Sequence, residues 1–182
     1  ERLQRIGGES NAFTTYERTG FFINTSSRYW RESLDLLLSY VIESTLDPQE
    51  VAREKSVILQ EIKMGENNPR NELWHLYLGA AYRTSPVRNP IIGHEEACLG
   101  LDRDALADYY VLRYQPDIMV VMVSGNVEPW EVIEFLLAKT KDFHRKGEAA
   151  PPNVEEPPQL GPRWQEKEFP LVRLTEAMIG FP

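Results

Sequence analysis

The sequence predicts an α+β fold, in which helices pack on one face of a mixed and largely antiparallel sheet. The composition is that of an ordinary globular protein, with 42% hydrophobic and 26% charged residues among 182. The predicted elements run in the order two strands, four helices, one strand and one helix. Such an uneven mixture of strands and helices favours the α+β class.

The chain opens with the end of a helix and continues with two strands. A Gly-Gly pair at residues 7–8 stops the helix that residues 1–6 complete. Because the sequence lacks an initiating Met and starts inside this helix, we expect the domain to be truncated at its N-terminus. Aromatic and β-branched residues among polar ones predict strands over Asn11–Thr15 and Gly20–Asn24.

Three helices follow, and residues typical of helix starts mark where each begins. The first starts at Ser26 or Ser27 and carries apolar residues at helical spacing. In the second, Asp47 is the expected N-cap and Pro48 the first helical residue, and the helix runs to about residue 65. Pro69 opens the third helix.

The second half of the chain alternates between loops and regular elements. Residues 83–100 contain two prolines and are predicted to form a loop. A helix then starts at Asp102, its expected N-cap, and ends by residue 115. The run Ile118–Val123 is continuously apolar, which is typical of a buried strand, and Pro129 starts the last helix.

The proline-rich stretch 147–163 is predicted to be an extended linker between two domains. Residues 1–146 then form a truncated N-terminal domain. Alternation of apolar and polar residues resumes near Leu171, so residues 164–182 are expected to supply the first strand of a following domain.

Composition also limits the partners and the compartment. A net charge of −8 is a poor match to nucleic acid or to an anionic membrane surface. The longest apolar run, Ile118–Val123, is too short to span a bilayer. Cys98 is the only cysteine, so neither an intrachain disulfide nor a thiolate metal cluster is available. This usage favours a cytoplasmic location, while a periplasmic or organellar one stays open.

Several common catalytic motifs are absent from the sequence. It has no G-x-S-x-G, no Walker loop and no H-E-x-x-H, and none of His75, His94 and His144 lies four residues from another. Cys98 follows His94 by four residues, but a lone cysteine is more often a small buried residue than a nucleophile.

Two glutamates of the second helix remain as candidates. Glu54 and Glu61 are seven residues apart, about two helical turns, and therefore lie on the same side. Both are expected at the margin of the apolar stripe of this helix, where a carboxylate needs a basic side chain, backbone N–H groups or a metal as its partner. Spacing alone favours an ordinary role on the helix surface, in which each glutamate pairs with Arg53, Lys55 or Lys63 or is simply solvated.

Four segments, in this order and spacing, resemble the pitrilysin/insulinase family of zinc peptidases, which includes the mitochondrial processing peptidases. The segments are GGESNAFTTYERTGFF, VAREKSVILQEIKMGENNP, NPIIGHEEA and ALADYYVLRYQPDIMVVMVSGNV. The resemblance covers nearly the whole chain. The resemblance implies the metallohydrolase fold of the processing peptidases and a zinc-dependent endopeptidase activity.

The resemblance also assigns roles to the two glutamates. Members of this family bind Zn²⁺ through H-x-x-E-H and through the second glutamate of a later E-x6-E pair. Glu61 matches that zinc ligand, and Glu54 matches its supporting carboxylate. The H-x-x-E-H motif is not in this sequence, so the other ligands are expected upstream of Glu1, in a longer parent protein. We therefore expect this polypeptide by itself to be inactive.

The segment NAFT matches the family's substrate-binding edge strand. Asn11, Ala12, Phe13 and Thr14 would pair with an extended peptide or an unfolded polypeptide segment, which joins as an added strand. An ordinary hairpin strand is the simpler interpretation of the same residues. The resemblance further implies a homodimer, or a heterodimer with a homologous subunit. Two alternatives remain: a non-catalytic homologous subunit of a peptidase complex, and an unrelated α+β binding domain.

Overall fold

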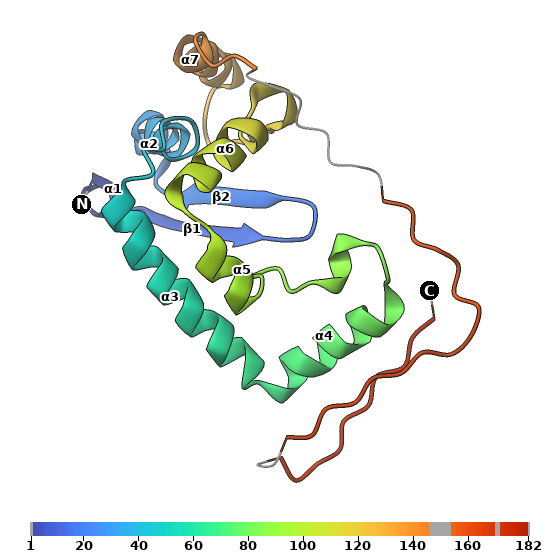
Figure 1. Cartoon of the computed structure of the whole chain (residues 1–182). Coiled ribbons are helices and arrows are strands. Elements are labelled where there is room, and N and C mark those ends of the chain that lie inside the picture. The colour runs from blue at the N-terminus through green and yellow to red at the C-terminus, as the bar shows by residue number, and fades with distance from the viewer. Residues whose placement is uncertain (1, 146–153, 170–171, 182) are drawn as a thin grey trace. The chain divides into compact units, whose positions relative to one another are not determined.

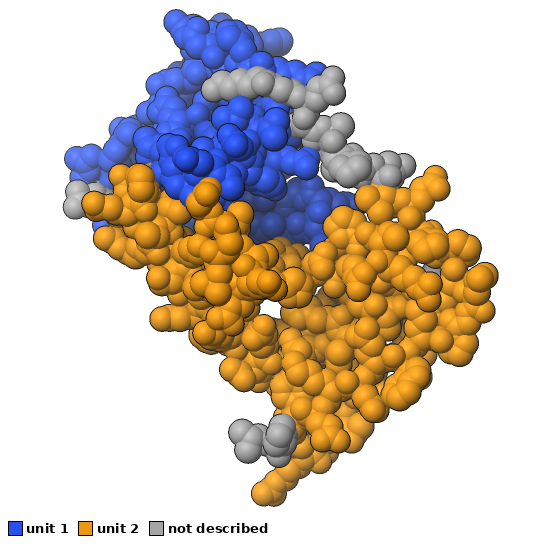
Figure 2. Space-filling view, in the orientation of Figure 1, with its two compact units in different colours: residues 1–46, 103–150 blue, residues 47–102, 151–182 orange. Residues whose placement is uncertain are grey.

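The computed structural model describes residues 2–145, 154–169 and 172–181 and confirms the α+β class (Figure 1). The chain divides into two compact units, each made of two stretches of sequence (Figure 2). Unit 1 comprises residues 1–46 and 103–150, and unit 2 comprises residues 47–102 and 151–182. No helix among the described residues is long and apolar enough to cross a bilayer.

Unit 1 holds a two-stranded antiparallel sheet and the helices beside it. Its elements are α1 (Arg2–Arg5), β1 (Glu9–Thr14), β2 (Thr19–Asn24), the 3₁₀ turn η1 (Ser27–Tyr29), α2 (Trp30–Ile42), α6 (Arg103–Arg113), the 3₁₀ turn η3 (Pro116–Ile118) and α7 (Pro129–Thr140). The two predicted strands are confirmed, with shifts of one or two residues at their ends. The predicted helix starts near Ser27 and at Pro129 are confirmed as well.

The core of unit 1 forms where α2 packs against α7. Leu34 and Leu38 of α2 and Val132 of α7 are buried together. The rings of Trp30 and Phe135 meet edge to face across the same contact, with centroids 5.6 Å apart. The apolar spacing that predicted α2 therefore describes the face that it buries.

Tyr110 of α6 and Tyr114, the residue after this helix, join it to the rest of unit 1. The hydroxyl of Tyr110 donates a hydrogen bond of 2.7 Å to the carbonyl of Val41, in the last turn of α2. Burial raises the pKa of the Tyr110 hydroxyl, which keeps this donor protonated. The ring of Tyr114 lies 6.3 Å from that of Phe21, so β2 contacts the end of the α6 segment.

Unit 2 is built on α3 (Pro48–Glu66) and α4 (Pro69–Ala81), which contact each other. Their starts are as predicted. Asp47 accepts hydrogen bonds from the N–H groups of Gln49 and Glu50 at 2.9 and 3.2 Å, and Asn68 caps α4 in the same way. Each cap is followed by a proline, whose fixed φ suits the first helical position.

The predicted loop over residues 83–100 is wrong in part, because it contains η2 (Pro86–Arg88) and α5 (Glu95–Gly100). The six-residue α5 packs against α3 and buries Cys98. The ammonium of Lys55 donates to the carbonyls of Leu99 and Leu101 at 2.6 and 2.7 Å. These tertiary contacts stabilise a helix too short to form from its own propensity.

Two predicted strands are wrong. Residues 119–124 follow η3 without joining a strand ladder, and Val120 and Met122 are each 86% exposed. The described residues 172–181 form no strand either, while Leu171 lies outside the described residues. An apolar alternating segment becomes a strand only where another strand supplies hydrogen bonds, and the described chain pairs only β1 with β2.

The predicted linker and domain boundaries stay predictions. Residues 154–163 follow an extended course without helix or strand, in agreement with the proline-rich composition. Residues 147–153 lie outside the described residues.

We expect Asp35→Asn to lower the free energy of unfolding of unit 1 by about 1 kcal/mol at pH 7. The Asp35 carboxylate binds Lys139 of α7 and also lies 3.5 Å from the guanidinium of Arg2. The bond from Lys139 is the main cause that holds the pKa of Asp35 below its usual 3.8. Because the folded pKa is the lower one, this stabilisation is complete above about pH 4 and is lost as the pH falls through the folded pKa.

Urea unfolding followed by circular dichroism at pH 7 and pH 3 measures this difference. Asp142→Asn is the control, since Asp142 forms only a long 3.9 Å pair with the adjacent Lys141. If the Asp35→Asn variant were as stable as the unmodified chain at pH 7, the ion pairs of Asp35 would not contribute to the stability of unit 1.

Candidate functional site

One edge of the hairpin is open along β1. The backbone N–H of Thr15 donates to the carbonyl of Arg18 at 2.8 Å, which makes these two residues a hydrogen-bonded pair. Hydrogen-bonded and non-bonded pairs alternate along an antiparallel ladder, and the register pairs Thr14 with Thr19 and Ala12 with Phe21. Ser10, Ala12 and Thr14 are therefore in the non-bonded pairs. Their backbone N–H and C=O groups point away from β2, toward the free edge.

The two faces of the hairpin differ in their surroundings. Ala12 and its partner Phe21 lie on the face that contacts α6. The opposite face carries Asn11 and Phe13, and the Phe13 ring lies over Gly20, where an added Cβ would come within 2.5 Å of it. Every residue of β1 is exposed. The predicted peptide-binding strand is thus an accessible edge strand. Its partner strand β2 has a glycine, Gly20, opposite Phe13, which leaves room for the Phe13 ring.

The predicted metal ligand and its supporting residue lie on α3 and are both exposed. The apolar stripe between them is as expected, since Ile62 is only 3% exposed and Val51 and Ile58 are half-buried. The expectation that the carboxylates lie at a buried margin is wrong. Within unit 2, α3 contacts α4 and α5, and these contacts leave the flank of Glu54 and Glu61 in solvent.

The ion pairs considered for these glutamates are absent from the described residues, and the other outcome that spacing allowed, solvated carboxylates, is the one observed. Arg53 instead binds Glu50 at 3.0 Å, and Lys63 binds Glu95 at 3.1 Å. Lys55 donates to the carbonyl of Leu99, within α5, and to that of Leu101, the residue after α5. Within the described part of the chain, no hydrogen bond or ion pair holds the side chain of Glu54 or Glu61. Both carboxylates are therefore available to a ligand.

Glu61 is suited to be one ligand of a zinc site, but the described residues do not supply the other ligands. A carboxylate oxygen is a regular zinc ligand, and catalytic zinc sites use three protein ligands. Over residues 2–145, 154–169 and 172–181, no group of three or more His, Cys, Asp or Glu side chains is placed to hold a metal. The β1 residues belong to unit 1 and the two glutamates to unit 2.

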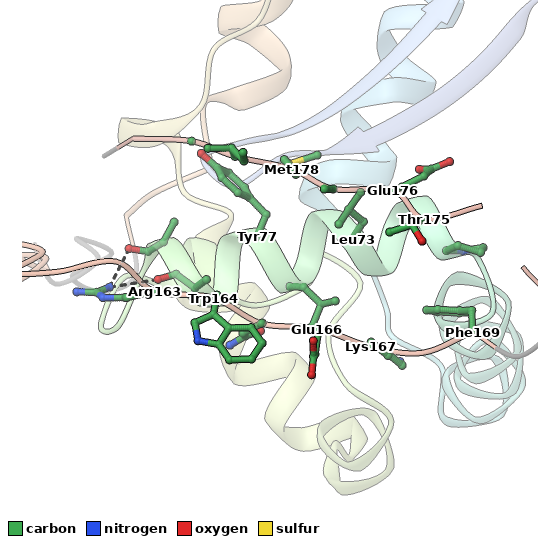
Figure 3. A pocket seen from close by; sticks show the side chains of 18 of the residues that line it. Leu73, Tyr77, Arg163, Trp164, Glu166, Lys167, Phe169, Thr175, Glu176 and Met178 are labelled. Atoms are coloured by element: carbon green, nitrogen blue, oxygen red, sulfur yellow. Dashed lines mark hydrogen bonds between the residues drawn. The ribbon is translucent and has the colours of Figure 1, made fainter. Parts of the chain in front are cut away.

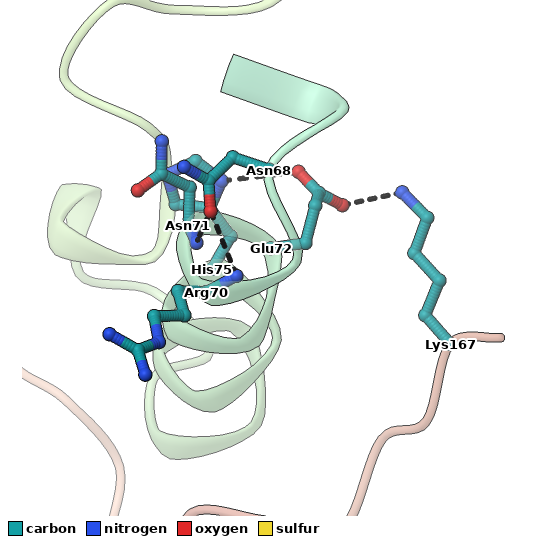
Figure 4. Close-up of polar contacts among 6 residues, drawn as sticks. All are labelled: Asn68, Arg70, Asn71, Glu72, His75 and Lys167. Atoms are coloured by element: carbon teal, nitrogen blue, oxygen red, sulfur yellow. Dashed lines mark hydrogen bonds and ion pairs between the residues drawn. The ribbon is translucent and has the colours of Figure 1, made fainter. Parts of the chain in front are cut away.

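Unit 2 has a hollow elsewhere, between α4 and the extended segments at residues 159–169 and 172–181 (Figure 3). Its volume is about 840 Å³, and none of the predicted site residues lines it. At one end Glu72 of α4 binds Lys167 at 2.5 Å and His75 at 3.5 Å (Figure 4). At the other end Arg163 donates to the last carbonyls of α4. The hollow is thus framed by contacts that attach the segment to the helix.

A second attachment of this segment was not predicted from the sequence. The Glu156 carboxylate accepts hydrogen bonds from the N–H groups of Arg83, Thr84 and Ser85, at 2.5, 2.9 and 2.8 Å. Burial raises the pKa of Glu156, but these backbone donors outweigh it and lower the pKa to about 2. Three successive N–H groups form an anion-binding nest. The sequence around Thr84 does not predict this nest, because the carboxylate that binds there, Glu156, lies more than seventy residues away in the chain.

Comparison with known proteins supports the same family as the sequence motifs. The sequence model of "Insulinase (Peptidase family M16)" matches residues 1–95, more than half of the chain. The chain belongs to the insulinase family of peptidases. Residues 100–182 match the family's second model, "Peptidase M16 inactive domain". The predicted pitrilysin/insulinase resemblance is thereby confirmed.

Relatives of this M16 chain are named as zinc proteases. It is 35% identical over 127 residues to the uncharacterized zinc protease YmxG of Bacillus subtilis, covering 70% of this chain and 31% of that protein. It is 32% identical over 133 residues to a Mycobacterium leprae protein also named an uncharacterized zinc protease, covering 73% of this chain and 30% of that protein. The chain spans about a third of the length of these relatives.

A solved structure agrees with the fold. The crystal structure of a protease from Helicobacter pylori superposes with a TM-score of 0.84 at 27% sequence identity. The match covers 88% of this chain and 40% of that one. Fold and family together support a peptidase, while the roles of individual residues remain predictions.

We expect Glu156→Gln to loosen the attachment of residues 154–169 to unit 2. An amide side chain is a weaker acceptor than a carboxylate, so hydrogen-exchange protection of the Thr84 and Ser85 amides should fall about tenfold. Because the folded pKa of Glu156 is lowered from 4.5 to about 2, the attachment is complete above about pH 4.5 and is lost as the pH falls toward 2. Glu155→Gln is the matched control. Equal protection of the Thr84 and Ser85 amides in the two variants would show that the Glu156 carboxylate does not hold this segment.

Proposed function

We propose that this chain provides part of the active centre of a zinc-dependent endopeptidase that cleaves extended peptides or unfolded polypeptide segments. The observation that carries the proposal is the state of Glu61 and Glu54. Among the residues that the structure describes, both carboxylates lack an ion pair or hydrogen bond on one side of α3, and the three nearby basic residues are bound to other groups. Family membership and the names of the relatives support zinc as the metal.

Glu61 is the proposed zinc ligand and Glu54 the group that orients the coordination around it. Such supporting carboxylates hold a ligand in the orientation that the metal requires. Bound zinc would polarise a peptide carbonyl and lower the pKa of a water molecule. The exposed position of both carboxylates on α3 supports this assignment in one respect, since no neighbouring side chain has to be displaced before a metal binds.

The peptide is proposed to bind along β1 as an added strand. Ser10, Ala12 and Thr14 present backbone donors and acceptors to the free edge, as strand addition requires. Recognition through the backbone depends little on side-chain identity. It therefore favours substrates that are extended or unfolded over folded proteins.

Exposed apolar side chains support an assembly larger than this chain. Val120, Met122 and Trp130 of unit 1 are among the large apolar residues that stand mostly in solvent. Exposed apolar surface of this kind is usually covered by further protein. We propose a homodimer, or a heterodimer with a homologous subunit, as the state in which the peptidase acts.

The alternative is a non-catalytic homologous subunit of a peptidase complex. One observation favours it: the exposed carboxylates of Glu54 and Glu61 need no partner to remain stable in solvent. Their presence therefore does not by itself require a metal. Zinc content separates the two functions, because the alternative predicts none.

We expect Glu61→Gln to remove tightly bound zinc from the full gene product that carries this sequence, and peptide cleavage with it. Loss of one of three ligands should lower cleavage by at least about a hundredfold. Zinc is measured by mass spectrometry after dialysis, and cleavage with a quenched fluorescent peptide. Glu66→Gln, on the same helix and equally exposed, is the matched control and should retain both.

We expect Glu54→Gln to have a smaller effect, about 10- to 100-fold on zinc affinity or cleavage, because it acts through the ligand rather than on the metal. A parent protein that stays free of zinc after reconstitution would overturn the enzymatic proposal and leave the non-catalytic subunit. The isolated 182-residue chain should bind zinc only weakly in either case.

A further inference from the structure

The free edge of β1 contains one backbone donor that is already occupied. The N–H of Ala12 donates a hydrogen bond of 2.8 Å to Oδ1 of Asn11, the preceding residue. Ala12 is in a non-bonded pair with Phe21, so its N–H points away from β2. The side chain of Asn11 thus takes the position that the carbonyl of an added strand would occupy.

The other outward donors of the strand differ from Ala12. Ser10 and Thr14 flank it at the next two outward positions of the same edge. Within the described residues, no hydrogen bond engages the N–H of either one. The central donor of the edge is therefore capped from within the strand, and its two neighbours remain open.

We propose that Asn11 is an edge cap, a side chain that protects the Ala12 N–H in the free protein and turns away when a peptide strand is added. The proposal rests on the peptide-binding role of β1 and adds a control of access to it. Asparagine is suited to this role, because its short side chain forms local bonds with nearby backbone groups. It is also exposed on β1, so it is free to rotate.

The edge cap has a consequence for the substrate. When a peptide carbonyl replaces Oδ1 of Asn11, one hydrogen bond is exchanged for another and the net gain at Ala12 is small. Affinity must then come from the outward groups of Ser10 and Thr14, which lie about 14 Å apart on an extended strand. The site should therefore select segments extended over at least about five residues and reject shorter contacts.

The edge cap also has a consequence for the free protein. An open strand edge pairs readily with other chains, and proteins usually blunt such edges. A removable cap on the central donor discourages pairing with chance partners without closing the edge to a peptide that binds at all three positions.

The test measures peptide affinity and amide protection in the same variants. The probe is a fluorescein-labelled ten-residue peptide of alternating threonine and valine with a lysine at each end, titrated by fluorescence anisotropy. Asn11→Ala removes the competing acceptor and should bind the probe about three- to tenfold more tightly than the parent chain. Asn11→Gln, which carries the amide one methylene farther out, should behave like Asn11→Ala. Asn11→Asp keeps Oδ1 as a stronger, charged acceptor and should bind the probe no more tightly than the parent chain.

Hydrogen exchange of the Ala12 amide provides a readout that needs no peptide. Its protection should fall about fivefold or more in Asn11→Ala and Asn11→Gln, and should stay in Asn11→Asp. Asn24→Ala, at the end of β2, is the matched control and should change neither measurement.

The two measurements separate this proposal from the proposed function. If the probe binds the parent and Asn11→Ala equally, or if Ala12 protection is the same in both, the edge cap is overturned while strand addition stands. If the probe binds no variant, strand addition at β1 fails, and the edge cap fails with it as a control of substrate access.

Discussion

The candidate peptide-binding edge depends on one constraint, the alternation of backbone direction along the antiparallel hairpin. The turn sets this alternation. Thr15 donates to the carbonyl of Arg18, and its hydroxyl accepts from the N–H groups of Glu17 and Arg18 at 3.3 and 3.2 Å. A slip of one residue would direct the backbone groups of Ala12 toward β2 and those of Asn11 outward. The turn chemistry around Thr15 therefore decides which residues of NAFT can meet a peptide.

The availability of the two glutamates has a cause within the helix and a tertiary one. Lys55 follows Glu54 by one residue and Lys63 follows Glu61 by two, and side chains at these spacings do not face each other on a helix. Both lysines are also bound by α5 and the residue after it, through the carbonyls of Leu99 and Leu101 and the carboxylate of Glu95. A short helix that is marginal in isolation thus holds two nearby cations away from the proposed ligand and its supporting residue.

Local signals made most of the elements predictable from the sequence, and non-local contacts account for the failures. Asp47-Pro48 and Asn68-Pro69 give the starts of α3 and α4 because caps act within one turn. The helix α5 could not be predicted in this way, since it is stabilised by α3. Nor could the exposure of Glu54 and Glu61, because the helical period gives the direction of a side chain but not whether another element covers it. The candidate site residues were identified from four sequence segments in a characteristic order. None of these segments would have been sufficient alone.

The contrast between β1 and residues 119–124 indicates what a reversible strand edge requires. Both segments are extended, and in the described part of the chain at least one edge of each has no neighbouring strand. Val120 and Met122 expose large apolar side chains, and a strand that covered them would gain about 1.5–3 kcal/mol for each buried residue. Such a contact is suited to permanent burial. The free edge of β1 offers mainly backbone groups and small or polar side chains, and its central donor is already satisfied by Asn11. A peptide added there would gain little at each position and would leave again, as turnover at the proposed site would require.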